Sequence, residues 1–174
     1  KYMFWGSFRG IYATELTDNG LEIKKKTDGT PVLKKRICGN RFEGTNIYKR
    51  GEYYYLFASI GTCCNGATST YQTVVGRSKN VLGPYLDKTG RDMLYDYCEI
   101  IMSGNETWAG PGHNSILIQD DVGTDWIIYH GYKKKEAENG RYVLMDKLIW
   151  SNDGWPSVKS NAPSILEVAP YFQK

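Results

Sequence analysis

Short hydrophobic and aromatic runs recur along this chain, and almost none of them has the periodicity of an amphipathic helix. Aromatic and β-branched residues suit a pleated, half-buried surface, so these runs favour strands. Turn signals separate them, such as Asp18-Asn19-Gly20, Arg50-Gly51 and Asn152-Asp153-Gly154. The pattern predicts an all-β protein. The expected strands cover residues 2–8, 11–16, 46–49, 53–59, 72–77, 113–118, 125–132 and 142–150.

Three of these runs share a rough internal pattern. Tyr2–Ser7, Tyr54–Ser59 and Trp126–Gly131 each combine paired aromatic or aliphatic residues with a small or polar residue at the end. A sandwich or a barrel also fits many short strands with regular turns. Repeats at this spacing are, however, typical of propeller blades, which take roughly 40–50 residues each. We therefore expect a β-propeller that holds too few blades to close a ring.

Composition narrows the class of protein. With 174 residues, 41% hydrophobic and 24% charged, the chain fits one soluble globular domain. A net charge of +3 is too weak to indicate nucleic acid as a partner. No apolar run reaches the ~18–20 residues that a membrane span needs. Because the first residue is Lys1 inside an expected strand, with no signal-peptide pattern, we expect the true beginning to be missing or removed.

The four cysteines do not form a disulfide framework for a chain of this size. They occur at Cys38, Cys63, Cys64 and Cys98, with no Cys-x-x-Cys spacing, so a structural zinc site is not expected. Adjacent cysteines such as Cys63 and Cys64 close a small ring if they bond. The prediction is that all four are free, buried thiols.

The segment with the most specific chemistry is Arg41–Lys49, in which Glu43-Gly44 precedes a strand-like run, followed by a glycine turn and the aromatic run Tyr53–Ser59. This arrangement resembles the general-acid blade of glycoside hydrolase family 43, whose members are inverting enzymes acting on arabinan and xylan side chains. Further motifs, in the family's order and spacing, resemble its arabinanase-like members. They are Gly6–Leu16, Cys63–Tyr71, Val75–Tyr85, Gly110–Ser115, Tyr129–Tyr132, Gly140-Arg141 and Asp153–Pro156.

The resemblance implies a five-bladed β-propeller, of which this chain holds about the last two and a half blades. Residues 1–36 are expected to end the third blade, residues 37–97 to form the fourth, and residues 98–174 to form the fifth. The missing N-terminal blades are expected in the same polypeptide or in another chain.

The family pattern has three carboxylates, and only one of them can be placed here. Glu43 matches the general acid, whereas the general-base aspartate and the aspartate that tunes the acid fall before Lys1 in this numbering. A general acid must stay protonated near neutral pH, which partial desolvation or a nearby carboxylate brings about. In an inverting enzyme the base stands ~6.5–9.5 Å away. Without the resemblance, Glu43 reads as an exposed strand-edge carboxylate.

Other residues are candidates for sugar contacts through the same resemblance, with core packing as the alternative for each aromatic ring. Trp5 and Trp108 are two further rings of this kind. The proposed substrate-binding residues are Ser7, Phe8, Phe42, Asn46, Ser59 and Arg141.

His113, in Gly112-His113-Asn114, corresponds to a family histidine near the propeller axis that touches a metal, often calcium bound largely through water. Calcium prefers oxygen ligands, so the alternative is a buried histidine that bonds to backbone.

The function implied is a secreted, periplasmic or cell-surface bacterial glycosidase that cleaves α-L-arabinofuranosyl linkages in plant cell-wall arabinan or arabinoxylan. Endo-1,5-α-L-arabinanase activity is the leading expectation. The alternatives are an exo-acting α-L-arabinofuranosidase or β-xylosidase, and a non-catalytic carbohydrate-binding propeller.

Overall fold

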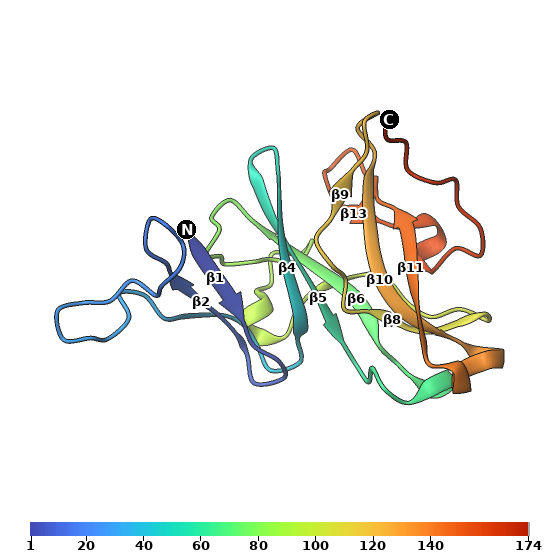
Figure 1. The fold of residues 1–174 in the computed structure, drawn as a ribbon, viewed down its shortest axis with the longest axis horizontal. Helices are drawn as coiled ribbons and strands as arrows, with labels where there is room; N and C mark the ends of the chain where they lie inside the picture. Colours follow the sequence, from blue (N-terminus) through green and yellow to red (C-terminus); the bar gives the residue numbers. More distant parts are fainter. Residues whose placement is uncertain (174) are drawn as a thin grey trace.

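The computed structural model of the chain describes residues 1–173 and consists of antiparallel sheets joined by turns and short 3-10 helices (Figure 1). The prediction of an all-β protein is confirmed. In the described residues no helix is long and apolar enough to cross a membrane. The short helices are η1 (Gly66–Thr68), η2 (Met93–Tyr95), η3 (Lys134–Asn139) and η4 (Lys159–Asn161).

Three sheets follow one another across the molecule in chain order, with the N-terminus on the first and the C-terminus beside the last (Figure 1). The first sheet contains β1 (Tyr2–Trp5), β2 (Ile11–Glu15) and β3 (Lys35–Cys38). The middle sheet contains β4 (Glu43–Arg50), β5 (Tyr53–Ile60), β6 (Gln72–Ser78) and β7 (Glu99–Met102). The third sheet contains β8 (Trp108–Gly112), β9 (Ile118–Gln119), β10 (Asp125–Lys133) and β11 (Arg141–Lys147). A small two-stranded sheet of β12 (Ile149–Trp150) and β13 (Pro156–Ser157) follows.

The middle sheet is buried on both faces, which explains the almost continuous apolar sequence of β5. Side chains alternate across a strand, so Leu56 and Ala58 point to one face and Tyr55 and Phe57 to the other. The first pair packs with Ile11, Ile37 and Phe42 toward the first sheet. The second pair packs with Ile127, Tyr129 and Trp155 toward the third sheet. The two cores therefore hold three sheets together.

One expected strand is wrong. Residues 113–118 form no continuous strand, and the strand lies instead at β8, in the preceding sequence Trp108–Gly112. Its glycines and proline resemble turn signals, but β8 is an edge strand, where the missing amide hydrogen of Pro111 does not break a ladder. Gly112 is required because a Cβ there would lie 2.4 Å from the ring of Tyr71.

The boundaries between the sheets differ by a few residues from the expected boundaries between the blades. β3 extends through Cys38, beyond the boundary at residue 36. β7, at residues 99–102, pairs with β6 in the middle sheet although it follows the boundary at residue 97. The assignment of the sheets to the third, fourth and fifth blades stays a prediction.

Candidate active site

Glu43 is the first residue of β4, where the pairing with β5 is irregular. The register of β4 against β5 shifts between Glu43 and Asn46, which marks a β-bulge. Gly44 has a φ of 63°, and a Cβ at this position would lie 3.1 Å from the imidazole of His113. The glycine of the Glu-Gly motif thus permits the bulge and the close approach of His113.

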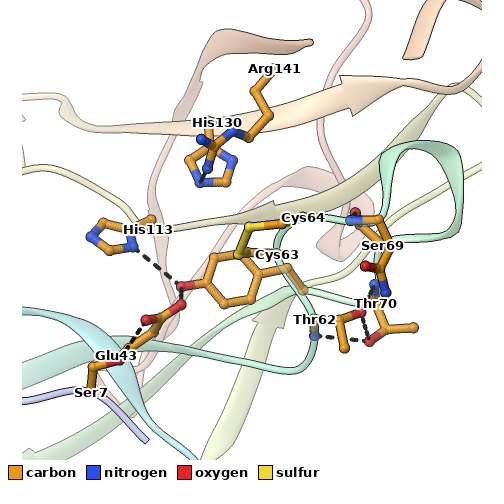
Figure 2. The surroundings of a disulfide bond; sticks show 12 residues. Ser7, Glu43, Thr62, Cys63, Cys64, Ser69, Thr70, His113, His130 and Arg141 are labelled. Carbon is orange, nitrogen blue, oxygen red and sulfur yellow. Dashed lines mark hydrogen bonds between the residues drawn. A yellow bond between two sulfur atoms is a disulfide. The ribbon is translucent and has the colours of Figure 1, made fainter. Parts of the chain in front are cut away.

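Both carboxylate oxygens of Glu43 accept a hydrogen bond from another part of the chain (Figure 2). The Ser7 hydroxyl, after β1, donates to Oε2 at 2.8 Å. The Tyr71 hydroxyl, before β6, donates to Oε1 at 2.6 Å. Three segments separated along the sequence therefore fix the orientation of one carboxylate.

Tyr71 contacts two histidines, His130 and His113. Its ring is fully buried and stacks on His130, with ring centroids 5.8 Å apart, and its hydroxyl lies 3.3 Å from Nδ1 of His113. Burial, together with the hydrogen bond to Glu43, raises the pKa of the Tyr71 hydroxyl well above its usual range. Tyr71 therefore remains protonated and acts as a donor.

A cavity of about 250 Å³ adjoins the carboxylate. It is lined by residues 4–7 at the end of β1, residues 43–45 at the start of β4, and residues 113–114 after β8. Among residues 1–173, Glu43 is the only carboxylate in this lining. The cavity therefore presents one acidic group among hydroxyl, amide, imidazole and aromatic side chains.

Two of the expected site residues adopt left-handed backbone conformations, which are uncommon outside glycine. Phe8 has a φ of 45° and His113 a φ of 51°. Both are held by hydrogen bonds from their amides: Phe8 N–H donates to the Phe42 carbonyl at 2.9 Å, and His113 N–H to the Ser59 hydroxyl at 2.7 Å. Such backbone strain gathers at functional sites, where the surrounding structure maintains it.

The structure corrects two expected sugar contacts. Phe42 is fully buried in the core between the first and middle sheets, so its ring cannot stack on a sugar. Ser59 is also fully buried, and its hydroxyl accepts the His113 amide. Both residues support the site from the interior: Phe42 packs in the core, and Ser59 holds the backbone of His113.

The other expected contacts are distributed around the carboxylate. The Phe8 ring is 44% exposed, and Trp5 lines the cavity of Glu43. Asn46 lines an adjoining cavity instead, and Trp108 is buried with its indole N–H donating to the Ser164 carbonyl. Apart from Trp108, which packs in the interior, these residues stay predicted sugar contacts.

Arg141 begins β11 and is exposed, with Nη1 3.4 Å from Nε2 of His130 (Figure 2). It is not part of the lining of the Glu43 cavity. A role in substrate binding stays a prediction.

The cysteine prediction is wrong for one pair: Cys63 and Cys64 form a disulfide (Figure 2). In a strand, consecutive side chains point to opposite faces, but these residues lie in the irregular connection between β5 and β6, where both sulfurs can turn to one side. Cys38 is free and buried, as expected, whereas Cys98 is free but only partly buried. Burial raises the pKa of both thiols, that of Cys98 to about 11, so they remain unreactive thiols.

Sequence reasoning missed Tyr71, Thr45 and Asn114. Tyr71 stands just before an expected strand, 28 residues from Glu43, and nothing in the local pattern marks its hydroxyl. Asn114 Oδ1 and Thr45 Oγ1 are buried atoms without a hydrogen-bond partner among the described residues. They line the same cavity as Glu43, which only the assembled strands reveal.

These two oxygens also bear on the expected calcium ion. The part of the chain that the structure describes contains no group of three or more His, Cys, Asp or Glu side chains placed to hold a metal. Thr45 and Asn114, whose side-chain oxygens have no hydrogen-bond partner within residues 1–173, nevertheless line the same cavity as His113, and calcium prefers oxygen ligands. The side chains of His113, Thr45 and Asn114 fit a cation as neutral ligands, and they would supply part of its coordination.

His130 gives a prediction for pH dependence. Burial, Arg141 and His113 lower its pKa to about 4 from 6.5, while Glu43 acts in the opposite direction. The unfolded chain then takes up the proton at a higher pH than the folded chain, so this residue makes folding less favourable as pH falls from about 6.5 to 4. In urea unfolding of wild type and His130→Gln, we expect the wild type to lose more stability than the variant between pH 7 and pH 4.5. An equal loss in both proteins would contradict this assignment.

Comparison with known proteins gives the same family from sequence and from structure. The protein-family model described as "Glycosyl hydrolases family 43" matches residues 1–156. An extracellular exo-α-(1→5)-L-arabinofuranosidase of Cellvibrio japonicus is 45% identical over 118 residues, covering 68% of this chain and 33% of that protein. An extracellular endo-α-(1→5)-L-arabinanase of Bacillus subtilis is 41% identical over 158 residues, covering 90% of this chain and 46% of that protein.

Among solved structures, the α-L-arabinanase of Cellvibrio cellulosa complexed with arabinohexaose superposes with a TM-score of 0.75 at 34% identity. The match covers 91% of this chain and 53% of that one. The chain thus spans about half the length of most relatives it matches, and a third of the first. Its three sheets form an incomplete β-propeller, as expected. With the family match extending over most of the sequence, this chain belongs to glycosyl hydrolases family 43.

Proposed function

We propose that this chain supplies the general-acid side of an inverting glycosidase active site that cleaves α-L-arabinofuranosyl linkages in arabinan. The observation that carries the proposal is the carboxylate of Glu43, which is fixed by two hydrogen bonds at the edge of a cavity. The names of the relatives support arabinan or its oligosaccharides as the substrate and an extracellular location. Endo action on internal 1,5-linkages is the leading form, and exo release of arabinose is the alternative.

In the proposed reaction Glu43 protonates the glycosidic oxygen as the bond to the anomeric carbon breaks. A second carboxylate, ~6.5–9.5 Å away, removes a proton from the water that attacks the opposite face of the sugar. Because the described residues contribute only Glu43 to the cavity, we propose that this base comes from blades outside them, in the same or another chain. If calcium binds, His113, Thr45 and Asn114 would hold it, and it would add fixed positive charge and link the strands around the cavity.

The test is the product profile of the full-length protein on linear 1,5-arabinan. Endo action is expected to give a ladder of oligosaccharides early in the reaction, whereas exo action gives short products from the start. Proton NMR of the first product should show inversion at the anomeric carbon. Retention of configuration, or binding of arabinan without any cleavage, would overturn the proposal, and the latter would favour a carbohydrate-binding propeller.

A further inference from the structure

The two carboxylate oxygens of Glu43 have different hydrogen-bond partners, and the partner of Oε1 is the hydroxyl of Tyr71. It donates a 2.6 Å hydrogen bond to Oε1 from a fully buried ring, whereas the partner of Oε2 is the hydroxyl of the exposed residue Ser7. We propose that Tyr71 is a positioning residue that holds Oε1 as an acceptor and so leaves the transferable proton on Oε2. This inference rests on the proposed role of Glu43 as the general acid.

The position of the Glu43 proton follows from the direction of this hydrogen bond. A protonated carboxyl group has one hydroxyl oxygen and one carbonyl oxygen, and only the carbonyl oxygen is free of a proton. Because the Tyr71 hydroxyl donates to Oε1 at 2.6 Å, its hydrogen occupies the side of Oε1. The proton of Glu43 then resides on Oε2, and the Ser7 hydroxyl, which donates to Oε2 when Glu43 is ionised, rotates to accept from it. In the transfer step the Oε2–H bond breaks, a bond forms between that proton and the leaving oxygen, and Glu43 is left as a carboxylate.

His113 completes the arrangement. Its Nδ1 lies 3.3 Å from the Tyr71 hydroxyl oxygen, whose single proton is already directed to Glu43. The hydroxyl oxygen can therefore only accept from this side, so Nδ1 carries the hydrogen and donates it. The network runs from His113 through Tyr71 to Glu43.

The ring of Tyr71 is held independently of its hydroxyl. Its amide donates to the Thr62 carbonyl at 3.1 Å, and the side chains of Thr62 and Thr70 bond across the same loop. The ring packs against Gly112 and stacks on His130. Replacement by phenylalanine therefore removes one hydrogen bond and keeps the packing.

The experiment compares Tyr71→Phe with wild type in the full-length protein. On linear arabinan we expect kcat to fall about tenfold to a hundredfold with KM within about twofold, because the acid loses its orientation. An aryl arabinofuranoside with a good leaving group needs little protonation, so its cleavage should change less than about threefold.

Tyr85→Phe is the matched control, because Tyr85 is fully buried and its hydroxyl donates at 2.6 Å to the Val81 carbonyl, away from Glu43. This variant should leave the rates on both substrates close to those of the wild type. If Tyr71→Phe lowers the rates on linear arabinan and on the aryl arabinofuranoside by the same factor, or lowers neither rate, the positioning role is wrong. Glu43→Gln distinguishes a failure of the positioning role of Tyr71 from a failure of the proposed function. If Glu43→Gln cleaves linear arabinan normally, the proposed function itself fails.

Discussion

Replacing Glu43 by glutamine in the full-length protein is expected to lower kcat for linear arabinan about a thousandfold. The amide cannot donate a proton to the leaving oxygen, and general acid–base catalysis contributes about a hundredfold to ten-thousandfold. An aryl arabinofuranoside with an acidic leaving group should keep most of its cleavage rate, since its departure needs little protonation. Rates on both substrates, measured at the pH optimum of the wild type, check this result.

The fold should survive this change. Glutamine keeps an oxygen that accepts from Tyr71 and a nitrogen that can donate to the Ser7 hydroxyl, so the thermal unfolding midpoint should remain close to that of the wild type. Glu52→Gln is a suitable control, because Glu52 is exposed and pairs only with Lys79 at the surface. Arabinan turnover by Glu43→Gln within a few-fold of wild type would remove Glu43 from the mechanism.

The largest effect on stability is expected at Asp125, which joins the middle and third sheets. Its carboxylate is almost fully buried and accepts hydrogen bonds from Tyr48 at 2.8 Å, Gln119 at 3.0 Å and the Trp150 indole at 2.7 Å. Arg50 lies 3.8 Å away and stacks on Trp150. Asp125→Ala leaves these donors without their acceptor, so the free energy of unfolding should fall by about 3–5 kcal/mol.

Urea unfolding of the full-length protein measures this loss. Asp125→Asn keeps one oxygen acceptor and should cost less than the alanine variant. Asp28→Ala is the control, because Asp28 lies in an exposed turn and accepts hydrogen bonds from Thr30 within that turn, so its loss should change stability far less than Asp125→Ala does. A loss below about 1 kcal/mol for Asp125→Ala would show that the sheets do not depend on this carboxylate.

The carboxylate of Glu43 and the hydrogen-bond network of Asp125 lie at opposite ends of β4. β4 begins at Glu43 beside the cavity and ends at Arg50, next to the network of Asp125. One end of the strand thus presents the acid, and the other end anchors the middle sheet to the third. Since the anchor and the acid share a strand, a rigid join between the sheets helps to keep Glu43 in place.

The sequence alone determined the features that depend on local chemistry. Alternating aromatic and β-branched runs with glycine turns predicted the hairpin of β4 and β5 and most other strands, because strand propensity and turn type are local properties. The Glu-Gly motif identified Glu43, since its neighbours resemble a known pattern. Local reading failed at β8, where glycines that accommodate the ring of Tyr71 look like turn residues.

Tertiary structure decided the partners of the carboxylate and the fate of its neighbours. Ser7 and Tyr71 reach Glu43 across 36 and 28 residues, and no periodicity records such contacts. Phe42 is buried, although the sequence places it beside the acid, because the first sheet packs over the middle one there. Hydrophobic alternation shows that a strand has two faces, but which face is covered depends on the neighbouring sheet.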